Sequence, residues 1–180
     1  AIFEAFSGVT TTGGTILTEI EGRLSAPLHL WRTMTHWIGG LGIVVLFVAM
    51  LPSLGVGGKR LFQSEAAGPD SGGLSPRIRD TAKVLWWIYL SFTMIEFLVL
   101  RVVGMPWFDA ITHAFSNMAT GGFSTKNSSI GEYNSLSIEV VMTLFMLVAG
   151  TNFALFHSAK ANGLSVFWKS HEFRVYMFLF

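Results

Sequence analysis

Two kinds of residue are scarce in this chain, and each shortage excludes a class of protein. There is no cysteine, which excludes disulfides, thiol catalysis and thiolate metal sites. Charged residues make up 13% of the 180 residues and hydrophobic residues 51%, whereas an average soluble domain has about 25% charged residues. So few charges cannot cover the surface in water, and we expect a lipid bilayer around the chain. A net charge of +1 without a dense basic cluster gives no reason to expect nucleic acid.

The histidines do not have the spacing of a metal site. There are five of them: His29, His36, His113, His157 and His171. Only the first two have helical spacing, and no His-Glu-x-x-His motif accompanies them. We therefore interpret the histidines as packing or interfacial residues.

The two ends of the sequence resemble the middle of a longer protein. Residues 1–7 have the character of the last turns of a helix, and no initiator methionine or signal peptide precedes them. The chain stops inside an apolar run at residues 175–180. We expect an internal portion of a larger membrane protein.

Three apolar segments are long enough to cross a bilayer, which takes about 20 residues. They are residues 28–51, 84–103 and 136–156. Pro52 is expected to end the first. Residues 53–83 form a polar loop, rich in glycine and proline, whose basic excess is typical of the cytoplasmic side. A second basic segment, expected on the same side, contains Lys160, Lys169 and Arg174.

Glu96 is the one deeply placed charge of the second span. A carboxylate within a membrane segment usually faces protein or water rather than lipid. We expect it to pair with Arg101 or with a helix outside this sequence. A proton relay is the alternative.

Residues 107–118 are apolar but too short to cross a membrane. Pro106 and Asp109 are typical of a helix start. A half-length apolar helix between two full spans indicates a re-entrant helix, which dips into the bilayer and returns. The following residues, 119–125, include two glycines and cannot continue a helix comfortably.

An internal repeat gives the strongest indication of architecture. Residues 5–15 align without gaps on residues 114–124, sharing the tripeptide Ala-Phe-Ser, a threonine and the glycine at positions 13 and 122. Acidic residues, Glu4 and Asp109, precede the two copies. Each copy ends a short helix and is followed by an apolar span. The predicted unit is therefore helix, re-entrant helix, loop, helix.

The loops of this repeat suit a cation. A re-entrant helix directs its partly negative C-terminus to the middle of the membrane. Non-helical backbone at that depth must be buried in protein or line water. Its carbonyl oxygens can then replace the hydration shell of a monovalent alkali cation. The predicted filter residues are Thr10, Thr11, Thr12 and Gly13 in the first copy and Ala119, Thr120, Gly121 and Gly122 in the second.

A plain glycine turn is the alternative for one such loop. Two copies, each after a short apolar helix, favour a pore loop, because loops exposed to lipid do not occur at that depth.

The third span contains a second irregular feature. Gly150, Thr151 and Asn152 interrupt its apolar run. Such a break frees backbone groups that need water or side chains as partners, and Gly150 is expected to act as a hinge. A packing glycine within a continuous helix is the alternative.

At these residues the sequence resembles the Trk/Ktr/HKT potassium transporter superfamily, most closely the bacterial Trk-type membrane subunit. The resemblance covers essentially the whole chain. It rests on the Phe-Ser-x-x-Thr-Thr-Thr-Gly loop and on four further segments, which are Trp37-Ile38-Gly39-Gly40-Leu41-Gly42-Ile43, Leu51-Pro52, Ser75-Pro76-Arg77-Ile78 and Ala149-Gly150-Thr151-Asn152-Phe153.

The resemblance implies an all-α, polytopic membrane protein with four repeats around one pore and one filter glycine per repeat. Gly13 and Gly122 take that position. Residues 1–52 would hold the end of one pore helix, its filter loop and its second helix. Residues 53–83 would be a cytoplasmic loop, residues 84–160 a complete repeat, and residues 161–180 a linker and the start of the next helix. This sequence would then hold only some of the four repeats.

The function implied by the resemblance is potassium uptake across the bacterial inner membrane, with K⁺ as the transported ion and no organic cofactor. The ion would be bound through the backbone carbonyls of Thr11, Thr12, Thr120 and Gly121. Residues 150–152 would form an intramembrane gate. Implied partners are a second copy in a homodimer and a cytosolic nucleotide-binding regulatory subunit.

Other functions remain open from the residues alone. A sodium-permeable channel or symporter of the same architecture would have the same loops. A structural subunit or an intramembrane enzyme is the remaining class, with Ser116 and His113 as nucleophile and base one helical turn apart. That pair lacks a third orienting residue and a nucleophile motif.

Overall fold

The computed structural model describes residues 2–54 and 76–179, and every regular element in these ranges is a helix. The elements are α1 (Ile2–Val9), α2 (Ala26–Leu54), α4 (Pro76–Val102), α5 (Trp107–Met118), the 3₁₀ helix η1 (Ser129–Tyr133), α6 (Leu136–Gly150), α7 (Phe153–Asn162), α8 (Ser165–Lys169) and α9 (His171–Leu179). The all-α prediction is confirmed.

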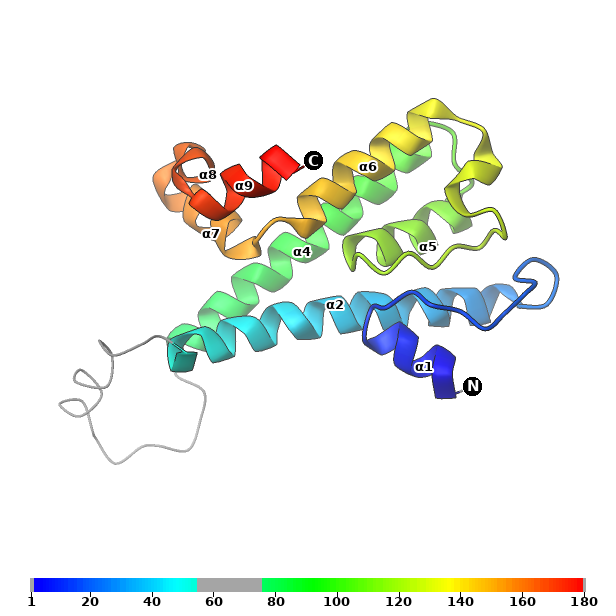
Figure 1. Ribbon diagram of the computed structural model, residues 1–180, viewed down its shortest axis with the longest axis horizontal. Coiled ribbons are helices and arrows are strands. Elements are labelled where there is room, and N and C mark those ends of the chain that lie inside the picture. Colours follow the sequence, from blue (N-terminus) through cyan, green and yellow to red (C-terminus); the bar gives the residue numbers. More distant parts are fainter. Residues whose placement is uncertain (1, 55–75, 180) are drawn as a thin grey trace.

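The short helix α5 is surrounded by the long ones. It packs against α2, α4 and α6, while α1 packs on another side of α2 (Figure 1). Its bounds agree with those predicted from the sequence, because Pro106 precedes the first turn and the residues after Met118 leave the helical conformation. Within the described ranges, residues 82–102 of α4 are long and apolar enough to cross a membrane, and α6 is a shorter apolar helix.

Two predicted boundaries are wrong. Pro52 does not end α2, which continues to Leu54, because a proline near a helix end removes one backbone hydrogen bond without disrupting those before it. The helix that contains the second span begins at Pro76, inside the predicted loop, although its membrane-length apolar segment, residues 82–102, agrees with the predicted span 84–103. Proline is well tolerated at the first helical position, since its missing N–H would have no partner there. Residues 76–83 are therefore helix rather than loop, and the rest of the predicted cytoplasmic loop, residues 55–75, lies outside the described residues.

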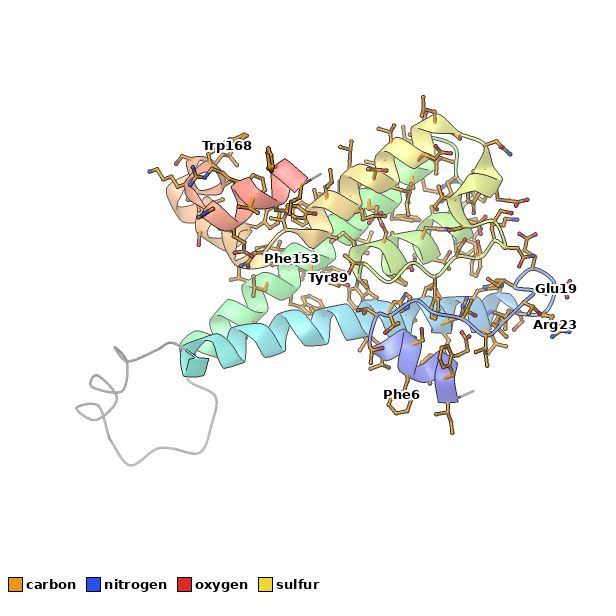
Figure 2. All side chains as sticks on the ribbon, in the orientation of Figure 1. Phe6, Glu19, Arg23, Tyr89, Phe153 and Trp168 are labelled. Atoms are coloured by element: carbon orange, nitrogen blue, oxygen red, sulfur yellow. The ribbon has the colours of Figure 1, made fainter. Side chains whose placement is uncertain are left out.

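Two apolar clusters hold α5 in place. The first lies at the C-terminal end of α5 and contains Leu85, Tyr89, Met118, Ala149 and Phe153. The second lies at its N-terminal end and contains Leu100, Met105, Ala110, Ile138 and Met142. The rings of Tyr89 and Phe153 are 5.8 Å apart, where α4 meets the start of α7 (Figure 2).

The outer surface is apolar where a soluble protein would be polar. Phe6 is 68% exposed and Trp168 is 69% exposed, and both side chains point away from the helices (Figure 2). Polar side chains such as His36, Glu96 and Asn117 are buried. Large exposed apolar surfaces are typical of contact with lipid or with further protein, so this distribution agrees with the membrane setting expected from composition.

Candidate functional site

The two predicted filter loops adopt the same backbone conformation. The first loop, residues 10–15, follows α1, and the second loop, residues 119–124, follows α5. Thr11 and Gly13 have φ values of 54° and 73°, and the aligned residues Thr120 and Gly122 have 53° and 87°. A β-branched residue at positive φ is uncommon and strained. Because a strained threonine and a glycine at positive φ recur at aligned positions, both loops are expected to serve one purpose.

The same two backbone hydrogen bonds tie each loop to its helix. Thr11 donates its N–H to the Gly8 carbonyl at 3.1 Å, as Thr120 donates to Asn117 at 2.8 Å. At the next position, the N–H groups of Thr12 and Gly121 bond the carbonyls of the two aligned serines, at 3.0 and 2.9 Å. The start of each loop is therefore fixed to the last helical turn.

Four carbonyl oxygens of these loops accept no hydrogen bond within the described part of the chain. Among the hydrogen bonds made by the described residues, none ends on the carbonyls of Thr11, Thr12, Thr120 or Gly121. Of these four residues Gly121 is buried and Thr11 is half-buried, whereas Thr12 and Thr120 are exposed. These four are the carbonyls to which the resemblance assigns the ion.

The two loops approach each other at Gly13. A Cβ atom on Gly13 would overlap the carbonyl oxygen of Gly121. Gly13 is therefore glycine for two reasons, since its positive φ also disfavours a side chain. At Gly122 the positive φ is the reason that the structure gives, because no atom of the described residues lies within 4 Å of the position where a Cβ would be.

Two consecutive glycines place α2 against both loops. A Cβ on Gly39 would overlap the carbonyl oxygen of Val9, at the end of α1. A Cβ on Gly40 would lie 2.9 Å from the Tyr89 hydroxyl and 3.0 Å from Ala119 Cα, at the end of α5. The Gly-Gly pair in the sequence motif of α2 thus allows one helix to contact the ends of both short helices.

A buried histidine of α2 supports the second loop. His36 is fully buried and its ring stacks on Phe123, with centroids 3.9 Å apart. The Arg32 guanidinium lies 3.6 Å from the centre of the same Phe123 ring. A side chain on Gly121 would overlap the His36 ring. Position 121 is therefore glycine in the second loop because His36 fills the space of a side chain there.

The serine and histidine considered for an enzyme are not paired. Ser116 hydrogen-bonds His36 Nδ1 at 3.1 Å, whereas His113 hydrogen-bonds Ser124 at 3.0 Å. The two serine hydroxyls therefore bond two different histidines, and both contacts support the second loop.

Glu96 does not pair with Arg101, so that alternative of the expectation is wrong; the other alternative, a helix outside this sequence, stays a prediction. Asn117, in the last turn of α5, donates its Nδ2 to Glu96 Oε1 at 2.5 Å and to the Met142 carbonyl at 3.1 Å. Arg101 donates instead to the Met105 carbonyl. Five residues along a helix turn a side chain about 140° away from the first, so Arg101 reaches the turn after α4 while Glu96 faces α5.

A cavity connects the loops with the break in the third span. Its volume is about 170 Å³, and its lining includes Thr11 and Thr120 from the two loops together with Ala149 and Phe153 on either side of the break. The remaining lining residues are Gly40, Tyr89, Met118 and Ala119. The structure thus brings three of the predicted filter residues, Thr11, Ala119 and Thr120, and the neighbours of the predicted gate residues to one space.

The predicted break is present in the backbone. Helix α6 ends at Gly150, Thr151 is extended with φ −77° and ψ 141°, and α7 begins at Phe153. The Leu147 carbonyl, which the break frees from the helical pattern, accepts the Thr151 hydroxyl at 3.0 Å. The break is therefore a defined loop with its own hydrogen bonds rather than a kink in a continuous helix.

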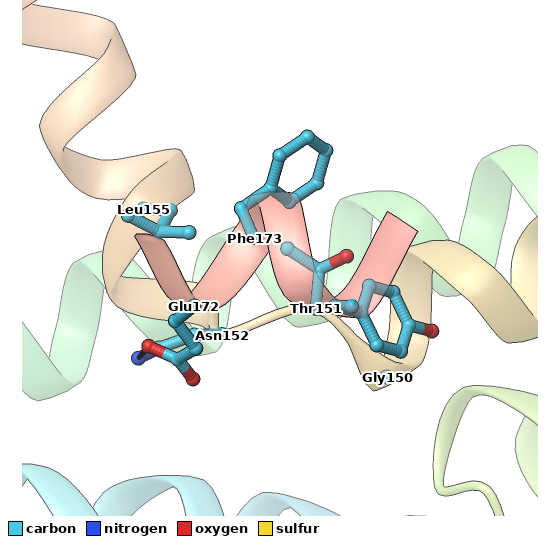
Figure 3. Close-up of a pocket in the computed structure, with 7 residues that line it drawn as sticks. Gly150, Thr151, Asn152, Leu155, Glu172 and Phe173 are labelled. Carbon is cyan, nitrogen blue, oxygen red and sulfur yellow. Dashed lines mark hydrogen bonds between the residues drawn. The ribbon is translucent and has the colours of Figure 1, made fainter. Parts of the chain in front are cut away.

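Helix α9 covers this break, a contact that the sequence did not predict. Tyr176 donates its hydroxyl to the Leu147 carbonyl at 3.0 Å, and Asn152 donates to Glu172 Oε2 at 3.3 Å. A small cavity of about 80 Å³ lies between α9 and the break (Figure 3). A Cβ on Gly150 would lie 2.5 Å from the Tyr176 hydroxyl oxygen. Gly150 is helical, so this close approach, and not a hinge of special φ, accounts for the glycine.

Comparison with known proteins identifies the family to which the chain is similar. The family model described as "TrkH: Cation transport protein" matches residues 1–180. The chain is 45% identical to the Trk system potassium uptake protein TrkH of Salmonella typhimurium, over 98% of this chain and 37% of that protein. It is 43% identical to the Trk system potassium uptake protein TrkG of Escherichia coli, over 87% of this chain and 32% of that protein.

A solved structure agrees with these matches. The crystal structure of the potassium transporter TrkH from Vibrio parahaemolyticus superposes with a TM-score of 0.83 at 40% identity, over 98% of this chain and 35% of that one. The chain therefore spans little more than a third of the length of the relatives that it matches.

Proposed function

The chain belongs to the TrkH family of cation transport proteins, and we propose that it contributes two of the filter loops of a potassium uptake pathway across the bacterial inner membrane. The observation that carries the proposal is the pair of loops with matching positive φ angles and four carbonyl oxygens without partners among the described residues. Preorganised carbonyl oxygens can replace the water around a potassium ion without the cost of rearranging the backbone.

The ion ligands are proposed from the resemblance, and the geometry of the loops supports them. Potassium would be bound by the carbonyls of Thr11 and Thr12 in the first loop and of Thr120 and Gly121 in the second. Gly13 and Gly122 permit the positive φ that the loops need. The partly negative C-terminal ends of α1 and α5, which precede the loops, favour a cation at the same place.

We also propose that residues 150–152 form a gate beneath the filter. The cavity that touches Thr11 and Thr120 also touches Ala149 and Phe153, which flank the break. An ion leaving the loops through this cavity would meet the start of α7. A loop held by a few hydrogen bonds can change position at a cost of a few kcal/mol, so the break suits a movable constriction.

The remaining proposals concern assembly. The names of the relatives assign them to a Trk system, and we propose that the protein acts as a homodimer with a cytosolic nucleotide-binding regulatory subunit. Copurification from detergent-solubilised membranes tests this part alone, and recovery of a monomer without such a subunit would contradict it.

Ion flux tests the central proposal. The intact transporter that contains this chain would be reconstituted in liposomes, and uptake of radioactive rubidium, as a potassium tracer, would be measured against competing ions. We expect external K⁺ to suppress tracer uptake at concentrations where Na⁺ has little effect. Absence of monovalent cation flux would contradict the proposal, and equal suppression by Na⁺ would replace it with a non-selective or sodium-permeable pathway.

A further inference from the structure

The far end of the first loop is held by a carboxylate of the helix before it. Glu4, in α1, accepts through Oε1 the hydroxyl of Thr15 at 2.7 Å and the backbone N–H of Ile16 at 2.8 Å. The Thr15 oxygen in turn accepts the N–H of Leu17 at 3.1 Å. Thr15 lies two residues after the filter glycine, so this contact fixes the segment that leaves the loop.

The second loop repeats this arrangement with a different residue. In the alignment of the two copies, position 113 corresponds to position 4 and position 124 to position 15. His113, in α5, contacts the Ser124 hydroxyl through Nε2 at 3.0 Å. The Ser124 oxygen accepts the N–H of Lys126 at 3.0 Å, two residues further on, just as Thr15 does from Leu17.

The direction of the hydrogen bond is also the same in both copies. His113 Nδ1 lies 2.7 Å from the Asp109 carbonyl oxygen, which can only accept, so Nδ1 carries the proton. In a neutral imidazole Nε2 is then an acceptor. Ser124 accepts a backbone N–H and donates its own proton to Nε2, as Thr15 donates to Glu4. The chemical identity of the side chain differs between the copies while its function as an acceptor is kept.

We propose that Glu4 and His113 are positioning residues for ion selectivity, each latching the departing segment of its filter loop to the preceding short helix. This inference rests on the proposed function of the loops. Backbone hydrogen bonds fix the start of each loop to the last helical turn, and the latch fixes its end. The carbonyls between the two fixed points then keep their direction. A second contact secures each latch: Arg32 Nε bonds Glu4 Oε2 at 2.9 Å, and Thr125 bonds Asp109 at 2.7 Å.

The two copies supply matched variants for the test. Thr15→Val keeps the shape of the side chain and removes the hydroxyl, whereas Thr15→Ser keeps the hydroxyl, as the second copy naturally does at Ser124. Thr15 bonds a carboxylate that is ion-paired with Arg32, and one hydrogen bond to a charged group corresponds to about a tenfold change in an equilibrium. In the reconstituted intact transporter we expect Thr15→Val to lower the K⁺/Na⁺ selectivity ratio by about that factor, and Thr15→Ser to retain it.

Three outcomes separate the latch from the filter itself. Retained selectivity in Thr15→Val, together with a loss in Gly122→Ser, would overturn the latch and leave the filter standing. Retained selectivity in Gly122→Ser as well would contradict the filter. A loss in both Thr15→Val and Thr15→Ser would show that the hydroxyl is not the cause. Ser124→Ala gives the same test in the second loop if Thr15→Val does not fold, and elution as a monodisperse particle in detergent is the folding control.

Discussion

Replacing Gly150 by alanine tests whether α9 holds the break closed. The new Cβ would lie 2.5 Å from the Tyr176 hydroxyl oxygen. The tip of a tyrosine can move, so the steric cost itself is small, but the movement breaks the hydrogen bond to the Leu147 carbonyl. One such bond contributes about 1 kcal/mol, which corresponds to about a fivefold shift between closed and open states. We expect basal tracer flux into liposomes to rise by that factor.

A double variant makes this reasoning refutable. Tyr176→Phe removes the same hydrogen bond and also the atom that the new Cβ would meet, since the next nearest atom, Tyr176 Cζ, lies at 3.3 Å. The flux of the double variant should therefore equal that of Tyr176→Phe alone. If the two effects multiply instead, Gly150 and Tyr176 act independently, and α9 does not hold the break closed through the Tyr176 hydroxyl.

Two further predictions concern buried groups of the core. Glu96→Gln keeps the oxygen that accepts from Asn117 and should retain transport and stability. Glu96→Leu leaves the Asn117 amide short of an acceptor and should cost about 1–3 kcal/mol of stability, seen as a lower melting temperature. Loss of transport in a stable Glu96→Gln protein would instead favour the proton relay. Gly13→Ala should destabilise the purified protein more than Gly122→Ala. Both variants place a side chain at positive φ, which costs about 1–2 kcal/mol of stability, but only Gly13→Ala also meets the Gly121 carbonyl. Equal losses in melting temperature would contradict the close contact of the two loops.

Local patterns predicted the short helix and the two loops because the determining residues are neighbours in sequence. Pro106 starts α5, and the glycines that follow Met118 allow the chain to leave the helix. The repeat carried the same information twice. The position of the break after Gly150 was also predictable, because turn-forming residues within an apolar run favour an interruption of the helix.

Contacts between distant segments were not predictable from these patterns. Glu96 has a basic residue nearby on its own helix, and only the packing of α5 shows that Asn117 is its partner. Tyr176 and Glu172 reach the break from α9, more than one element away, and nothing in the local sequence marks them. For the same reason Gly150 was predicted as a hinge, whereas the glycine makes room for the Tyr176 hydroxyl.

The latch was hidden for a different reason. Glu4 and His113 occupy aligned positions but share neither charge nor shape, so identity within the repeat does not reveal them. In the sequence, the shared negative charge makes Glu4 look equivalent to Asp109 instead. The equivalence becomes visible when the hydrogen bonds to Thr15 and Ser124 are compared.

The K⁺/Na⁺ selectivity of Gly122→Ser in the intact, reconstituted transporter tests the central claim most directly. No atom of the described residues lies within 4 Å of the new Cβ, so the substitution makes no clash in this part of the chain, while φ of 87° disfavours any side chain by about 1–2 kcal/mol. If that strain is relieved by turning the adjacent carbonyls away from the ion, the selectivity ratio should fall about tenfold. An unchanged ratio in a well-folded Gly122→Ser protein would contradict the assignment of these loops as the filter.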